Sequence, residues 1–241
     1  MRKIQIFFLV FLAAGFLLVS CSKDDGDNGN GQNQPNNPSG FSIPDGVGVL
    51  AAVKVTTITP VPGYGNYEVT TGTGTAWFGS PGSTSGNDAG TVKLNGQALT
   101  WNSSGGVYIA NFEASFPPVS WEVSGSASVP AFTKNISASF PEFSGDLPEN
   151  PTINEDLTIS LSGKVSNADS VIAVVAGNTA VMKVVSAGAN QVTISKSQLS
   201  SLGSIQQISI NAVKYLPETI EGKKLWFILE GSKARIYNVM P

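Results

Sequence analysis

The sequence predicts an all-β protein with two tandem immunoglobulin-like β-sandwich domains, and three observations carry this prediction. Charged residues make up only 13% of the 241 residues, whereas an average globular domain has about 25%, and Gly, Ser, Thr and Asn are abundant. Two-residue turn signals lie between strand-like runs. Apolar and polar residues alternate in several segments, which is the pattern of a half-buried strand.

The turn signals are three dipeptides. Asn95-Gly96 joins runs 91–94 and 97–100, and this pair tolerates the positive φ angles of a type I′ hairpin turn. Gly177-Asn178 joins runs 171–176 and 179–185. Gly231-Ser232 joins runs 225–230 and 233–239 as a type II′ turn, which would place Glu230 opposite Lys233 as an ion pair.

Alternation predicts further strands with one buried and one solvated face. The apolar sets are Leu157, Ile159 and Leu161 in one segment and Ile208, Ile210 and Ala212 in another. In the second segment Ser209 and Asn211 are expected to face water. The only helical pattern is the short segment 197–202, which ends before Gly203.

Residues 141–156 concentrate proline, acidic residues and turn formers between two alternating regions. We therefore expect a first β-sandwich domain at 45–142, a linker at 143–149 and a second β-sandwich domain at 150–241. Each domain would have the size and strand spacing of an immunoglobulin-like sandwich. The alternative is one larger β-sandwich or barrel.

The first residues of the chain have the pattern of a signal peptide. Arg2 and Lys3 precede an apolar stretch, residues 4–19, which is short for a membrane-spanning helix. Leu18, Val19, Ser20 and Cys21 resemble the lipobox of bacterial lipoproteins. This resemblance implies cleavage after residue 20 and a triacylated Cys21, so residues 1–20 would be removed.

The residues after Cys21 resemble an export signal. Ser22 stands where an aspartate retains lipoproteins at the inner membrane of enteric bacteria, and Lys23, Asp24 and Asp25 resemble the Lys-acidic-acidic signal of Bacteroidota-type surface lipoproteins. The resemblance implies an outer-membrane protein facing the cell exterior; the alternative is the periplasmic face. Residues 26–40 lack large apolar side chains, so residues 21–44 are expected to form the lipidated Cys21 and a disordered tether.

The amino-acid composition limits the kinds of catalytic and binding site that the chain can contain. The chain has no histidine and a formal net charge of −3, so it lacks the usual general base and the clustered positive charge of nucleic-acid binders. We expect no catalytic residue, no cofactor and no metal. A carboxylate-dependent glycoside hydrolase is a third hypothesis, with Glu122 as the first acid to test. Calcium binding by the acids of the linker region is left open; these acids are Asp146, Glu149, Glu155 and Asp156.

Four aromatic residues are candidates for stacking on sugar rings: Trp101, Tyr64, Tyr67 and Trp77. Trp77 is adjacent to Phe78 in a predicted strand, so the two point to opposite faces. Trp121 and Trp226 are expected in the core. Asn66 and Asn102 are polar neighbours suited to a glycan platform.

Ser170 is a candidate O-glycosylation site, because Asp169-Ser170-Val171 resembles the short signal of Bacteroidota-type exported proteins. Together these features predict a non-catalytic lipoprotein that is bound to the membrane through its lipid and acts as a binding or scaffold module. Its partner would be a glycan or an envelope protein. The alternative is a glycan-capture accessory protein of an outer-membrane uptake system.

Overall fold

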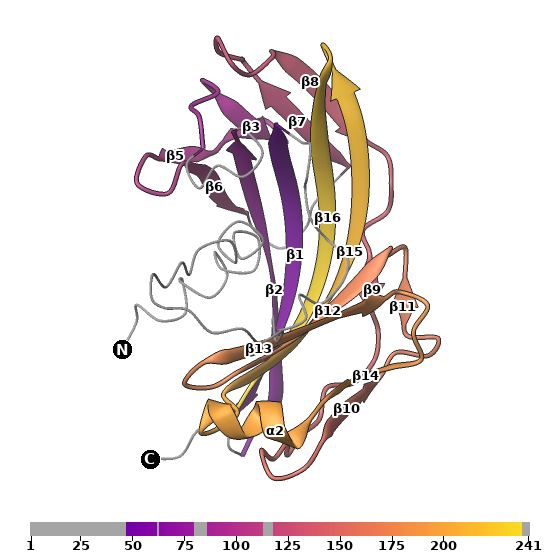
Figure 1. The fold of residues 1–241 in the computed structure, drawn as a ribbon. Coiled ribbons are helices and arrows are strands. Elements are labelled where there is room, and N and C mark those ends of the chain that lie inside the picture. Colours follow the sequence, from indigo (N-terminus) through magenta and orange to yellow (C-terminus); the bar gives the residue numbers. More distant parts are fainter. Residues whose placement is uncertain (1–46, 62, 80–85, 113–117, 238–241) are drawn as a thin grey trace, which may run out of the picture.

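The computed structural model describes residues 47–61, 63–79, 86–112 and 118–237. The signal peptide, the lipobox, Cys21, the export signal and the tether therefore lie outside the described residues. Within the described residues, no helix is long and apolar enough to cross a membrane. The fold is all-β, as predicted, with one short helix (Figure 1).

The largest element is an eight-stranded sheet whose centre consists of four long strands (Figure 1). β1 and β16 pair in parallel, and the other neighbours pair antiparallel. In order across the sheet, the strands are β13 (Ala180–Ser186), β12 (Ser170–Ala176), β15 (Gln207–Ile220), β16 (Lys223–Ile236), β1 (Gly48–Val61), β2 (Gly65–Phe78), β6 (Val107–Phe112) and β5 (Thr100–Asn102).

Three smaller sheets complete the fold. A four-stranded sheet contains β4 (Gln97–Ala98), β3 (Val92–Leu94), β7 (Val119–Val123) and β8 (Phe132–Ile136). Two-stranded sheets join β10 (Leu157–Ser160) to β14 (Gln191–Ile194) and β11 (Val165–Ser166) to β9 (Glu142–Phe143). The predicted helix is present as α2 (Lys196–Leu199), which continues into the 3₁₀ turn η1 (Ser200–Leu202).

One face of the large sheet, called the core face, contributes to two hydrophobic cores. At one end, Leu50 and Phe227 pack with Leu94 and Trp121 of the four-stranded sheet. At the other end, Ile208 and Ile210 belong to a second core with residues of β10 and β14. We call the opposite face, which carries Glu230, Asn211, Val213, Val53 and Ile228, the Glu230 face.

The two halves of the chain differ from the predicted pair of independent domains. The boundary at 143–149 does mark the change from one core to the other, but β16, from the predicted second domain, pairs with β1 of the first. Leu225, Phe227 and Leu229 of β16 also fill the first core. Alternation identifies a strand but not its partners, so the sequence did not reveal that the halves share a sheet.

Two of the three predicted turns are confirmed. Asn95 and Gly96 have φ angles of 50° and 79°, and Gly177-Asn178 connects β12 to β13. The turn predicted at Gly231 is wrong, because strand β16 continues through this residue without interruption. A Cβ at Gly231 would collide with the carbonyl oxygen of Pro141, so this glycine allows the linker to cross the strand closely.

The hairpin that precedes β16 turns instead at Glu221 and Gly222, with φ angles of 49° and 75°. Alternating burial confirms the strand predicted for residues 157–161. Ile208, Ile210 and Ala212 are buried as expected. The expected solvated face of β15 is wrong, because Ser209 and Asn211 are also buried. The Glu230 face is thus a buried face that includes polar side chains.

Candidate binding site

The β1–β2 hairpin continues past its neighbouring strands. β16 pairs with β1 only as far as Ile58, and β6 pairs with β2 only from Gly72 to Ala76. We call residues 59–71, without residue 62, the hairpin arm. Residues 59–61 and 65–67 of the arm extend the sheet as a two-stranded ribbon, whereas residues 68–71 pair with the part of β1 that also pairs with β16. The turn of the hairpin lies at the end of β1 opposite Gly48 (Figure 1).

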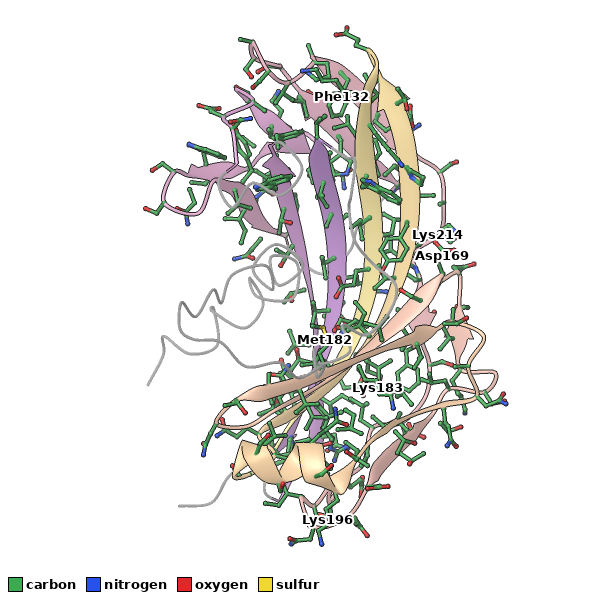
Figure 2. All side chains as sticks on the ribbon, in the orientation of Figure 1. Phe132, Asp169, Met182, Lys183, Lys196 and Lys214 are labelled. Atoms are coloured by element: carbon green, nitrogen blue, oxygen red, sulfur yellow. The ribbon has the colours of Figure 1, made fainter. Side chains whose placement is uncertain are left out.

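The arm carries most of the exposed apolar side chains of the described residues. Tyr64 is 90% exposed and Tyr67 is 63% exposed, and Val61 and Val69 are also exposed. The remaining exposed large hydrophobic residue is Met182, on the edge strand β13 (Figure 2). The register places Val61, Tyr67 and Val69 on one face of the ribbon, where they form an apolar surface of the kind that marks interaction sites.

A groove of about 480 Å³ adjoins the arm. Arg235 lies in it and is held on two sides. Its Nη2 donates to Oδ1 of Asn66, at 3.2 Å, and lies 3.6 Å from Oε1 of Glu149. The lining residues are Pro60, Glu149, Asn150, Pro151, Ile205, Arg235 and Tyr237.

Alternate side chains of the last strand hold the linker beside this groove. Lys233 Nζ donates a hydrogen bond to the carbonyl oxygen of Gly145, at 2.9 Å. The Tyr237 hydroxyl donates a hydrogen bond to the carbonyl oxygen of Pro148, at 2.6 Å. Burial raises the pKa of Tyr237 to about 12, so its hydroxyl stays a donor at physiological pH. The groove wall is therefore fixed by hydrogen bonds.

Arg235 is the positively charged residue among those that line the groove. It is buried, and its Nε has no hydrogen-bond partner within the described part of the chain. Its partner Glu149 is largely exposed, so this ion pair is weak. A planar guanidinium is suited to binding an oxygen-rich ligand group, but Nε itself is buried, so a ligand in the groove would bind through the terminal nitrogens. No pattern in the sequence indicates Arg235, because its role depends on contacts with a linker that is distant in the chain.

The predicted aromatic residues do not form one platform. Tyr64 and Tyr67 are exposed as expected, but Trp77 is only 6% exposed. Trp101 is partly buried and packs against Tyr108, with ring centroids 4.6 Å apart. Tyr108 pairs with Ala76 of β2, nine residues from Tyr67, which is about 30 Å along a strand. The grouping of Trp101 with the tyrosines is therefore wrong.

Trp101 belongs instead to a structural cluster around Tyr108. The Tyr108 hydroxyl donates to the Asp88 carboxylate and accepts the N–H of Ala89, at 2.8 Å. Burial and the Asp88 contact raise the pKa of Tyr108 to about 12, and the same hydrogen bond lowers the pKa of Asp88. Trp121 is fully buried, as predicted.

Other predicted positions have ordinary surroundings. Glu122 is half-exposed and lies 3.5 Å from Lys93 Nζ, away from the buried face of Trp121. Ser170 is partly buried, and its hydroxyl lies 2.9 Å from that of Tyr215, so a glycan on Ser170 would have to displace this contact.

The linker acids are separated by their partners. Glu149 faces Arg235, whereas Asp156 accepts the N–H of Lys196, at 2.7 Å. Among the described residues, no group of three or more Cys, Asp or Glu side chains is arranged to hold a metal ion.

Glu230 is the most unusual ionisable residue of the described chain. It is 2% exposed and lies between Val53 of β1 and Val213 of β15. Burial raises its pKa to about 7. Its Oε1, like Oδ1 of nearby Asn211, has no hydrogen-bond partner within the described residues. The predicted turn at Gly231 would leave Glu230 at the surface, so the burial of Glu230 was not expected from the sequence.

A scan against models of known protein families finds no match to this chain, and a search of curated proteins finds no significant similarity. The functional interpretation therefore rests on the residues of the hairpin arm and the groove.

Proposed function

We propose that this protein is a lipid-anchored, non-catalytic binding module of the outer membrane and that the hairpin arm is its recognition surface. One observation carries the proposal: four of the five exposed large hydrophobic residues of the described chain, Val61, Tyr64, Tyr67 and Val69, lie on this arm. Solvent exposure of such residues in a cluster is costly and is typical of surfaces that bind a partner.

The direction of β1 supports this proposal. β1 has 14 residues, so at about 3.3 Å per residue its two ends are roughly 45 Å apart. Gly48 lies at one end and the arm at the other (Figure 1). A chain anchored through Cys21 would enter the folded part near Gly48, and the arm lies at the opposite end of β1.

The groove supports binding in preference to catalysis. Its carboxylate, Glu149, faces Arg235 and not a second carboxylate, whereas a glycoside hydrolase needs two carboxyl groups on either side of the scissile bond. The groove thus offers a guanidinium, an amide and a phenol as hydrogen-bonding groups. These groups position a ligand without providing a general base.

A glycan is the second candidate partner, and the surroundings of Asn66 favour it. Tyr64 and Tyr67 are exposed and lie near this amide in the sequence; the register places the Tyr67 ring on the opposite face of the hairpin from Asn66, which reaches Arg235 in the groove. Each aromatic ring would add roughly 0.5–1.5 kcal/mol by stacking. A single site would be weak, so capture would depend on many tethered copies on one surface.

The proposal is tested with the full-length protein. Mass spectrometry of the mature N-terminus and protease shaving of intact cells examine the anchor at Cys21 and its orientation. The purified lipidated chain in detergent is then applied to a glycan array. We expect the Tyr64→Ala/Tyr67→Ala variant to lose binding at least ten-fold, with Trp101→Ala as the matched control that retains it. Binding that depends on Trp101 and not on the tyrosines would contradict the proposed surface.

A further inference from the structure

The outer edge of β2 is unpaired along the arm. β6 covers only residues 72–76 of this strand, and from Gly65 to Thr71 the described chain contains no strand on that side. Burial changes at the same point: residues 65–71 are exposed, apart from the partly buried Thr70, and residues 72–78 are all buried. The backbone N–H and C=O groups on the outer side of residues 65–71 therefore have no strand partner among the described residues.

Apart from the charge of Glu68, this edge lacks the features that usually protect an exposed strand. Natural edge strands are commonly very short, bulged, or interrupted by lysine or proline. Residues 65–71 read Gly-Asn-Tyr-Glu-Val-Thr-Thr, with no lysine or proline, and their register with β1 is continuous. The segment spans about 23 Å at roughly 3.3 Å per residue, which is enough for a short added strand.

We propose that this edge is a strand-addition site for an extended segment of a partner polypeptide. Tyr67 and Val69 project from one face of the edge and are exposed, so apolar side chains at alternate positions of the added strand would pack beside them. Glu68 projects from the other face and has no ion-pair partner in the described part of the chain. A basic residue between the two apolar ones would lie beside Glu68.

The charge of Glu68 argues against a second copy of the same edge as the occupant. In an antiparallel pairing of two copies centred on this segment, the two Glu68 side chains would lie opposite each other, and like charges in that position are destabilising. A second copy could instead offer its other edge strand, β13, which carries Lys183. This lysine is already engaged within the molecule, because its Nζ donates to the carbonyl oxygen of Thr193, at 2.6 Å. A basic segment from another protein fits the edge better.

The inference rests on the proposed binding role of the arm and is tested with synthetic peptides. The probe is acetyl-Ser-Val-Lys-Val-Ser-Val-Ser-amide, added to the full-length protein in detergent. One comparison peptide has Glu in place of Lys, and another has alternate backbone nitrogens methylated. Hydrogen exchange with residue-level resolution reports which amides become protected.

We expect slower exchange in residues 65–71, no change in β13, and at least ten-fold weaker binding of the methylated peptide, because it cannot form the hydrogen-bond ladder. The Lys peptide should bind about two- to five-fold more tightly than the Glu peptide, as expected for an exposed ion pair. Glu68→Lys should reverse this preference, whereas the matched variant Glu122→Lys, on a different sheet, should not.

Three results would overturn strand addition: equal binding of the methylated peptide, absence of protection at residues 65–71, or self-association through this edge without peptide. If the probe fails while glycan binding still depends on Tyr64 and Tyr67, the arm remains a recognition surface and only the strand-addition mechanism is wrong.

Discussion

The two halves of β2 have the same backbone conformation and opposite surroundings. Residues 72–78 are buried between neighbouring strands, while residues 65–71 are exposed along almost their whole length. The change occurs where β6 begins to pair, at Gly72. A continuous strand thus belongs to the core at one end and is exposed at the other, where we propose that a partner binds.

The side chains of the two halves follow from what packs on them. In the buried half, a Cβ at Gly74 would lie 2.7 Å from Cδ2 of Leu94, so glycine permits the four-stranded sheet to approach closely. In the exposed half, Tyr67 and Val69 have bulky side chains and no covering layer in the described chain. The packed half therefore combines small residues, where another sheet approaches closely, with the buried rings of Trp77 and Phe78, whereas the large side chains of the other half are exposed.

The largest expected difference between the two halves is in stability. Phe78→Ala removes a fully buried ring from the first core and should lower the free energy of unfolding by about 3–5 kcal/mol. Tyr67→Ala, in the exposed half of the same strand, should change it by no more than about 0.5 kcal/mol. Urea unfolding of both variants, followed by tryptophan fluorescence, measures the two effects.

Comparable losses in the two variants would contradict this division of β2, because they would show that the arm is covered and contributes to the core. Val69→Thr provides a second variant in the exposed half, with nearly unchanged volume. Its free energy of unfolding should remain close to that of the unmodified protein.

The comparison between buried and exposed positions also applies to the pH dependence of stability, for which two glutamates can be compared. Glu230 is buried beside Val53 of β1, whereas Glu68 is exposed on the arm. The pKa of Glu230 is raised from 4.5 to about 7 by burial, so between these pH values the unfolded state loses a proton that the folded state keeps. The contribution of Glu230 to the free energy of unfolding is therefore greatest below pH 4.5 and is lost as the pH rises towards 7, by about 3 kcal/mol at 1.36 kcal/mol per pKa unit.

Glu230→Gln should remove this pH-dependent loss, because the amide stays neutral in both states. Glu68→Gln is the matched control and should leave the pH dependence unchanged. Urea unfolding at several pH values from 4 to 8 distinguishes the two. A pH dependence that persists in Glu230→Gln would mean that another group titrates in this range.

Much of the local structure was predictable from the sequence. The all-β class, the Asn95-Gly96 turn, the short helix before Gly203 and the burial of Trp121 depend on neighbouring residues, and alternation or turn propensity reports them directly. Gly231 was misread because its glycine serves a contact with Pro141, not a turn. Contacts between residues so distant in sequence leave no periodic signal.

The candidate site was only partly predictable for the same reason. Tyr64 and Tyr67 were correctly expected to be exposed, although only Tyr64 lies in the turn and Tyr67 belongs to strand β2. Arg235 could not be identified, because its neighbours Asn66 and Glu149 come from the arm and the linker. Trp101 was misassigned because adjacency to a loop does not show whether a ring packs inward on a residue such as Tyr108.

The smallest expected effects concern the linker contacts that support the arm from the core face. Glu149→Gln removes the charge of an exposed ion pair at 3.6 Å and should lower the free energy of unfolding by less than about 0.5 kcal/mol. Tyr237→Phe removes a partly buried hydrogen bond to Pro148 and should cost more, about 1 kcal/mol. Urea unfolding orders the two variants, and a larger loss for Glu149→Gln would show that Arg235 depends on this carboxylate. Hydrogen exchange of residues 65–71 should be unchanged in both, because the exposed edge of β2 makes no contact with the linker that would protect its amides.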